Sequence, residues 1–306
     1  MKETAIQFGA AARLSGILCE PESTRAPDRP VVVFLNAGLI HRIGPHRLHV
    51  EAARALAAHG LASLRFDLSG AGDSGHRGDR LPFEESSILE TREAMDFLGE
   101  RLAARNVILF GLCSGAMVAV KTAARDPRVV GAVLINTQSH TSDPKLQRLV
   151  AQKKESHYFW SVSIFNPGAW RRALTGRSAY RQNLRMLLRQ VGDAVLRRRP
   201  RVPAGSWDME SDFRVLAERE IPVLHFFSRG DPAYEIYSAA VGLGVAGRNP
   251  CPSVTIELCT GTDHTFTPAW SRAQLIARLL AWVDLARRKG RSDGSGAATG
   301  KGTRGT

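Results

Sequence analysis

The chain has 306 residues, of which 43% are hydrophobic and 23% charged, and these values exclude a disordered chain. No stretch reaches the ~20 apolar residues that a membrane helix needs, and the first residues lack the apolar segment of a signal peptide. The four cysteines form no CxxC pair. We therefore expect free thiols, a cytoplasmic location and no contact with a membrane.

Strand and helix patterns alternate along the chain, which predicts an α/β protein with a mostly parallel central sheet flanked by helices. Apolar runs typical of buried strands cover Val31–Leu35, Leu61–Phe66, Val107–Phe110, Val129–Ile135, Val223–Phe227 and Val254–Leu258. Helical patterns cover His46–His59, Glu84–Ala104, Ser114–Arg125, Tyr234–Val245 and Pro268–Arg288. The glycine at position 60 is expected to end the helix before it.

The alternation stops in the middle of the chain, where helical and loop patterns occur without a convincing strand. We predict a core made of residues 1–140 and 216–289, with a helical cap inserted at 141–215. Residues 290–306 are rich in Gly, Ser and Thr and have almost nothing to bury, so we expect a disordered tail.

The predicted cap is strongly basic. From Lys145 to Arg201 it has fourteen Lys or Arg against two acids, so it carries +12 of the net charge of +13. Arg181, Arg185 and Arg189 recur every four residues and form a stripe, which is either a solvated helix face or a docking site for an anion. The anion would be an acidic acyl carrier protein or the phosphates of CoA. Nucleic acid is not expected, because no motif for its recognition is present and few aromatic residues lie between the arginines.

The sharpest chemical feature is Gly111-Leu112-Cys113-Ser114-Gly115, which follows a strand and opens a helix. This is the G-x-nucleophile-x-G pattern of a strand–turn–helix elbow, with cysteine at the nucleophile position. The two glycines keep side chains away from adjacent backbone, and they place Cys113 rather than Ser114 at the centre. The helix N-terminus favours a thiolate. The alternative is that Cys113 is a small core residue and that the glycines only pack helix on strand.

The catalytic partners of a nucleophile at this position should follow in the order acid, then histidine. Asp231 comes just after the strand Val223–Phe227, and His264 lies in the loop after the last strand. We therefore predict Cys113, Asp231 and His264 as a catalytic triad, with Glu235 and Asp263 as fallback acids. An adjacent imidazolium lowers the pKa of a thiol by several units, so such a pair can rest as thiolate and imidazolium.

An acyl-transfer site also needs N–H groups that stabilise the oxyanion. We predict the backbone N–H of Ser114 as one donor and that of Gly38 as the second, with Ala37 as the alternative to Gly38. His41, His46 and His49 follow this loop, but arginines share the region and no cysteine or carboxylate cluster accompanies them. We therefore expect no metal and no other cofactor.

Several segments together resemble the α/β-hydrolase superfamily. They are Asn36-Ala37-Gly38 with Ile43–Arg47, Arg65–Ser74, Gly111–Ala116 and Gly261–Phe266. Within the superfamily, the chain is most similar to the serine-aminopeptidase-like hydrolases, and especially to the cysteine-elbow branch found beside bacterial exosortase-associated and acyl-carrier pathways. The resemblance implies an α/β-hydrolase fold with a cap and a structural role for Asp67. Because cysteine replaces the usual serine, it also implies chemistry like that of dienelactone hydrolases or thioesterases.

These observations lead us to expect a hydrolase that acts on a small acyl substrate, an ester or a thioester, through an acyl-enzyme. Cys113 would attack the carbonyl, His264 would relay the proton, and Asp231 would orient His264. Two alternatives stay open. One is an acyltransferase that uses the same triad on a carrier-bound or CoA-bound acyl group. The other is a non-catalytic basic binding protein, although such a scaffold has no need of the intact Asp and His.

Overall fold

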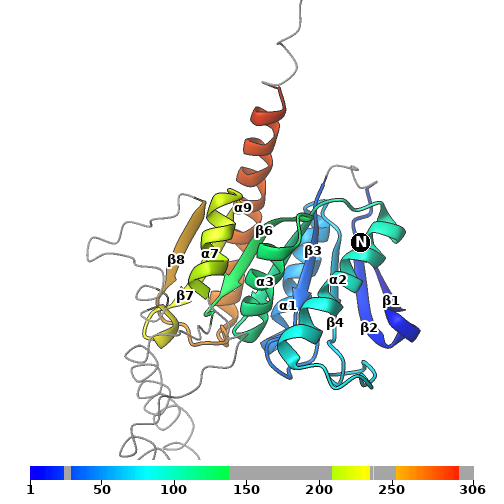
Figure 1. Ribbon diagram of the computed structural model, residues 1–306. Helices are drawn as coiled ribbons and strands as arrows, with labels where there is room; N and C mark the ends of the chain where they lie inside the picture. Colours follow the sequence, from blue (N-terminus) through cyan, green and yellow to red (C-terminus); the bar gives the residue numbers. More distant parts are fainter. Residues whose placement is uncertain (24–28, 138–208, 235–236, 238–252, 296–306) are drawn as a thin grey trace, which may run out of the picture. The chain divides into compact units, whose positions relative to one another are not determined.

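A computed structural model describes residues 1–23, 29–137, 209–234, 237 and 253–295 (Figure 1). The chain divides into two units, Met1–Ser139 with Met209–Thr306, and His140–Asp208. The second unit lies outside the described residues. The basic stripe of the predicted cap therefore lies there too.

The core of the first unit is a sheet of eight described strands in the order β1-β2-β4-β3-β5-β6-β7-β8. The strands are β1 (Lys2–Phe8), β2 (Leu14–Glu20), β3 (Val31–Leu35), β4 (Ser63–Phe66), β5 (Val107–Leu112), β6 (Val129–Ile135), β7 (Val223–Ser228) and β8 (Val254–Cys259). β2 is antiparallel to both β1 and β4, and the remaining pairs are parallel. The expected α/β-hydrolase fold with a mostly parallel sheet is confirmed.

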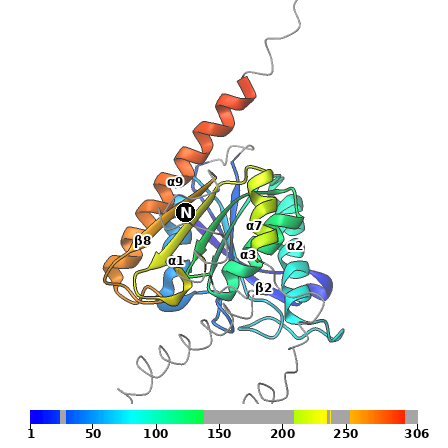
Figure 2. The same ribbon diagram turned by 60° about the vertical axis from the view of Figure 1, so that its left-hand side comes forward.

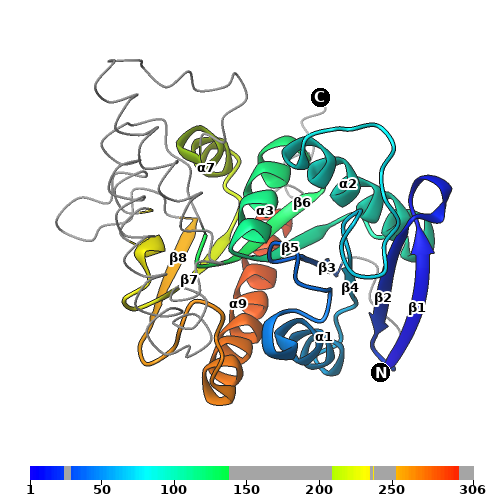
Figure 3. The same cartoon turned by 90° about the horizontal axis from the view of Figure 1, so that it is seen from below.

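Helices cover both faces of the sheet. They are α1 (Leu48–Ala58), α2 (Phe83–Leu102), α3 (Ser114–Arg125), α7 (Met209–Glu218) and α9 (Ala269–Ser295). α1 and α9 pack together on one face, and α2, α3 and α7 lie on the other (Figures 2 and 3). None of these described helices combines the length and the apolar composition that crossing a bilayer requires.

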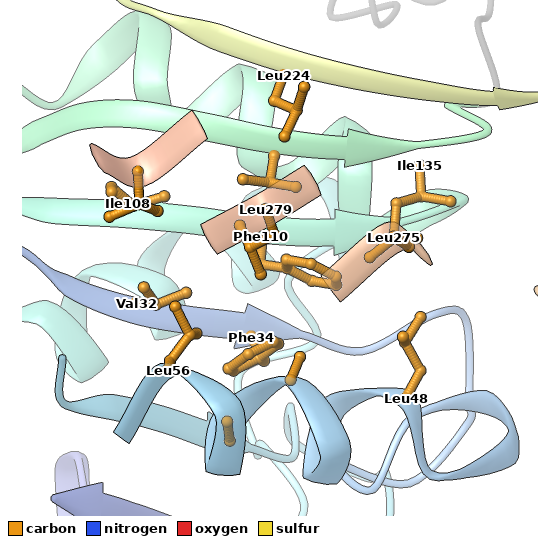
Figure 4. Packing of buried hydrophobic residues seen from close by; sticks show 14 of the residues in the cluster. Val32, Phe34, Leu48, Leu56, Ile108, Phe110, Ile135, Leu224, Leu275 and Leu279 are labelled. Atoms are coloured by element: carbon orange, nitrogen blue, oxygen red, sulfur yellow. The ribbon is translucent and has the colours of Figure 1, made fainter. Parts of the chain in front are cut away.

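The hydrophobic core beneath α1 and α9 holds the ends of the central strands in place. Phe34 of β3 and Phe110 of β5 lie with their ring centroids 4.8 Å apart, and both rings are fully buried. Leu56 of α1 and Leu279 of α9 cover them from the helix layer (Figure 4). Burying a side chain of this size stabilises the fold by roughly 1.5–3 kcal/mol. This packing therefore holds the ends of β3 and β5, which lead into the candidate site, in fixed positions.

The beginning of the chain differs from the sequence prediction, because β1 and β2 were not expected. β1 is an edge strand, and most of its residues are exposed or half-buried. The predicted helix over His46–His59 begins later, at Leu48, because His46 (φ 50°) and Arg47 (φ 66°) adopt left-handed backbone conformations that a right-handed helix excludes.

Two predicted domain boundaries also need correction. Residues 209–215, assigned to the cap, belong to α7, which packs on α3 through an ion pair between Lys121 and Asp212 (2.6 Å). The last helix continues to Ser295, so residues 290–295 are helical rather than part of a disordered tail. Most of the predicted helix over 234–245, and residues 296–306, lie outside the part that the structure describes.

Candidate active site

Cys113 occupies a sharp corner between β5 and α3. Its backbone has φ 58° and ψ −117°, a conformation that residues with a side chain rarely adopt and that often marks a functional site. Its N–H donates to the carbonyl of Ile135 at the end of β6 (2.9 Å), which holds the corner against the neighbouring strand. The side chain of Cys113 is half-buried rather than enclosed in the core.

The glycines on either side of this corner are required by backbone contacts. A Cβ atom at Gly111 would lie 2.3 Å from the carbonyl carbon and oxygen of Gly115. A Cβ atom at Gly115 would lie 2.6 Å from the carbonyl oxygen of Asn36, in the loop after β3. Both collisions involve backbone, which cannot move aside. The expected reason for this glycine spacing is therefore confirmed.

Asp231 and His264 come from the loops after β7 and β8, and they form a direct hydrogen bond. The distance from His264 Nδ1 to Asp231 Oδ2 is 2.7 Å. The other carboxylate oxygen of Asp231 accepts the N–H of Ala233 at 2.8 Å, and Asp231 itself is buried. This carboxylate is thus fixed by its own loop, and its hydrogen bond to Nδ1 orients the imidazole ring.

The environment of His264 strongly favours the protonated imidazole. Burial acts to lower the pKa of His264, but hydrogen bonding and opposite charge at Asp231 and Cys113 outweigh it and raise the pKa to about 10. The structure therefore joins His264 to Asp231 by a hydrogen bond, and Cys113 acts on the same imidazole by raising its pKa. An imidazole placed this way can carry a proton to or from a group reacting at Cys113.

The two fallback acids do not take the place of Asp231 among the described contacts. Asp263 Oδ1 accepts the N–H of Thr267 (2.8 Å). Burial acts to raise the pKa of Asp263, but hydrogen bonds from Thr267 hold it below its ordinary value. Its carboxylate therefore caps the turn that follows His264. Glu235 lies outside the described residues.

The predicted oxyanion donors lie on two adjacent segments. The N–H of Gly38 donates to the side-chain oxygen of Ser114 at 2.7 Å, so the loop after β3 meets the start of α3 beside Cys113. Gly38 has φ +59°, and a Cβ there would meet no atom of the described residues within 4 Å. Ala37 is buried, and its carbonyl closes a turn to Ile40 (3.1 Å). Gly38 is thus more exposed than Ala37, but its N–H is already donated to Ser114 Oγ.

Asp67, which the resemblance implied to be structural, holds the loop that carries Gly38. It is fully buried and its Oδ1 accepts hydrogen bonds from Asn36 Nδ2 (3.1 Å) and from the backbone N–H of Arg42 (2.6 Å). The guanidinium of Arg42 forms an ion pair with the other oxygen of this carboxylate. A carboxylate with this many donors fixes both ends of the loop.

The three histidines that follow the loop lie in separate surroundings. His41 lies near Asp67 and Asp73, but Arg42 already pairs with both carboxylates, and a cation there would have to displace the guanidinium. His46 Nε2 lies 2.9 Å from the hydroxyl of Thr267. His49 is buried, and burial lowers its pKa to about 4. The expectation that the chain needs no metal stays a prediction.

Sequence reasoning missed one residue of this region, Asn136. It follows β6 directly, has φ 43° and is fully buried. Its Nδ2 donates to the carbonyl of His264 (2.8 Å) and to Ser228 Oγ (2.9 Å), and its Oδ1 accepts the N–H of Ser228 (2.8 Å). Asn136 thus ties the end of β7 to the loop that carries His264. The one available signal was a polar residue directly after a buried strand, at the same edge of the sheet as Cys113.

Comparisons with known proteins agree with this architecture. The family model described as serine aminopeptidase, S33, matches residues 31–192, more than half of the chain. Among solved structures, proline iminopeptidase from Mycobacterium smegmatis is 18% identical, with a TM-score of 0.54 over 94% of this chain and 100% of that chain. An alpha-beta serine hydrolase homologue from Coxiella burnetii is 14% identical, with a TM-score of 0.52 over 92% of this chain and 96% of that one.

Dienelactone hydrolase from Anabaena variabilis is 16% identical, with a TM-score of 0.51 over 92% of this chain and 96% of that chain. At these identities the likeness concerns the fold alone. No curated protein matches the chain.

Proposed function

Since the chain belongs to the serine aminopeptidase S33 family of α/β hydrolases, we propose that it is a cysteine-dependent hydrolase of esters or thioesters that works through an acyl-enzyme. One observation carries this proposal. His264 is hydrogen-bonded to the buried carboxylate of Asp231, and its pKa is raised to about 10 by that bond and by Cys113, against the opposing effect of burial.

The proton on His264 supports a thiolate as the nucleophile. With a pKa of about 10, the imidazole carries a positive charge at neutral pH, and an imidazolium beside a cysteine favours the thiolate form. The N-terminus of α3, which begins at Ser114, adds a favourable dipole for negative charge. A thiolate reacts readily with activated acyl carbonyls such as those of esters and thioesters.

In the proposed first half-reaction, the sulfur of Cys113 attacks the acyl carbonyl carbon and the carbonyl electron pair moves onto oxygen. The oxyanion accepts hydrogen bonds from the N–H groups of Ser114 and Gly38. As the intermediate collapses, the bond to the leaving oxygen or sulfur breaks, and His264 gives that atom its proton. The product of this step is an acyl thioester on Cys113 and a free alcohol or thiol.

In the second half-reaction, water attacks the acyl thioester while neutral His264 takes its proton. The bond between the acyl carbon and Cys113 then breaks, which releases a carboxylic acid and restores the thiolate and imidazolium pair. Asp231 stabilises the charged imidazole in both halves. A thiolate is a better leaving group than an alkoxide, so this second half-reaction has a low barrier.

Chemical labelling of the cysteines tests the proposal, because the described chain contains a matched control. Cys259 is a half-buried free thiol like Cys113, but burial, together with Glu257, raises its pKa. We expect chloroacetamide to label Cys113 much faster than Cys259 at pH 7. We also expect Cys113→Ala to abolish turnover of p-nitrophenyl esters and acyl thioesters, while Cys259→Ala retains it. Equal labelling of the two thiols, or full activity in Cys113→Ala, would contradict the proposal.

We further propose that the basic cap binds the acidic partner of the acyl group, either a carrier protein or CoA, and that the enzyme works in the cytoplasm. The support is the local charge of +12 between residues 145 and 201, which attracts anions. Charge reversal at Arg181, Arg185 and Arg189 should raise KM for carrier-linked acyl groups and leave p-nitrophenyl esters unaffected. An equal effect on both substrate classes would exclude docking by these arginines.

A further inference from the structure

Ser114 has a side-chain hydroxyl as well as a backbone N–H close to Cys113. Its oxygen accepts the N–H of Gly38 at 2.7 Å, a bond that joins residues 76 positions apart in the chain. Ser114 directly follows Cys113 and is only half-buried, so this hydroxyl lies at the corner where the sulfur is. The predicted oxyanion donor Gly38 is therefore already in contact with a side chain.

The direction of this bond determines which hydrogen-bonding capacity of the hydroxyl remains unused. A serine hydroxyl has one hydrogen to donate and two lone pairs that accept. Because the N–H of Gly38 occupies a lone pair, the hydroxyl hydrogen points to another partner. Among the hydrogen bonds of the described residues, this hydroxyl donates none and accepts the one from Gly38. The hydroxyl is thus a donor held in place by the loop after β3.

We propose that the hydroxyl of Ser114 donates its hydrogen to the oxyanion that forms when Cys113 attacks a carbonyl. The inference rests on the proposed function, and the hydroxyl takes the place of the direct contact with Gly38, because the single N–H hydrogen of Gly38 is donated to Ser114 Oγ. The N–H of Gly38 would then act through the hydroxyl, as Gly38 N–H to Ser114 Oγ–H to the oxyanion. Hydrogen bonds in such a chain polarise and strengthen one another, and a donor fixed before the reaction needs no reorganisation during it.

An aldehyde tests the oxyanion contact without requiring turnover. The thiolate of Cys113 adds to the carbonyl carbon of hexanal and the carbonyl electrons move onto oxygen, which gives a tetrahedral adduct whose oxyanion would accept the proposed hydrogen bond from Ser114. The affinity of hexanal is measured as protection of Cys113 from chloroacetamide. Loss of one oxyanion donor costs about 10²–10³ in rate, so we expect Ser114→Ala to weaken hexanal binding by about 10- to 100-fold. Ser114→Thr, which keeps a hydroxyl, should stay within a few-fold of wild type.

Alkylation by chloroacetamide is the internal control. It attacks at a saturated carbon and forms no oxyanion, so the labelling rate of Cys113 should be the same in wild type and Ser114→Ala. Unchanged or tighter hexanal binding in Ser114→Ala would overturn the inference. An equal fall in hexanal affinity and in labelling rate would also overturn it. The substitution would then have changed the reactivity of the sulfur or the local structure rather than the stability of the oxyanion. If wild type itself shows no protection of Cys113 by hexanal, the nucleophile assignment fails, and this inference fails with it.

Discussion

The substitution Asn136→Ala probes how the loop of His264 is held. The side chain of Asn136 makes three hydrogen bonds, one to the carbonyl of His264 and two with Ser228. Its removal leaves the His264 carbonyl and the Ser228 N–H without these partners in a buried place, whereas the Ser228 hydroxyl keeps its bond to the carbonyl of Asp263 (2.7 Å). Each unsatisfied buried group costs about 1–3 kcal/mol. We therefore expect Asn136→Ala to lower the free energy of unfolding by about 2–6 kcal/mol.

Unfolding in guanidinium chloride, followed by circular dichroism, measures this change. The exposed Asn106, which contributes a backbone carbonyl to β3, offers a matched control, and Asn106→Ala should stay within about 0.5 kcal/mol of wild type. Because a small displacement of a catalytic group lowers the rate strongly, we also expect kcat to fall about 10-fold or more in the folded Asn136→Ala variant. A variant with both the unfolding midpoint and the kcat of wild type would refute the idea that Asn136 holds this loop.

Three further predictions follow from buried contacts. Gly111→Ala should lose at least about 3 kcal/mol of stability or fail to fold, because its Cβ would lie 2.3 Å from backbone, whereas Gly78→Ala, with nothing within 4 Å of its Cβ, should be neutral in the same unfolding assay. Lys121→Met removes the 2.6 Å partner of the buried Asp212 carboxylate, which keeps Arg125 at 3.1 Å, and should destabilise by about 1–3 kcal/mol; the double variant with Asp212→Leu should recover part of this loss, and no recovery would contradict the pairing. The pKa of His264 is raised to about 10 from an ordinary ~6.5, so its contribution to stability is full below about pH 6.5 and disappears as pH rises through 10; the gap in urea midpoint between wild type and His264→Gln should therefore shrink from pH 6 to 10, and a constant gap would count against it.

Much of the candidate site could be predicted because its constraints are local in sequence. The Ser114–Arg125 helix and the Val129–Ile135 strand agree residue for residue with α3 and β6. The glycine spacing around Cys113 reflects the collision that a Cβ at Gly111 would make with the backbone of Gly115, four residues further on, which any sequence with this corner must avoid. Parallel strands bring their carboxyl ends to one edge of the sheet, so residues after β7 and β8 were expected to lie near the elbow.

The missed features depend on contacts between distant segments. Asn136 bonds to Ser228 and His264, which lie 92 and 128 positions further along the chain, and an asparagine after a strand otherwise looks like an ordinary turn residue. The bond between Gly38 and the side chain of Ser114 was missed for the same reason. β1 escaped prediction because an edge strand buries little, and burial is what produces a clear apolar pattern.

The close approach of Gly115 to the carbonyl of Asn36 has a consequence for how this enzyme could change. Two stretches of main chain touch there with no side chain between them, so the spacing between sulfur and loop is set by peptide geometry alone. Substitutions elsewhere in the interior can therefore lower the stability of the protein without changing the geometry between the sulfur of Cys113 and a substrate carbonyl. Differences in substrate specificity between variants should then come from side chains around the site, such as the exposed Leu39, while the geometry of the reacting groups stays constant.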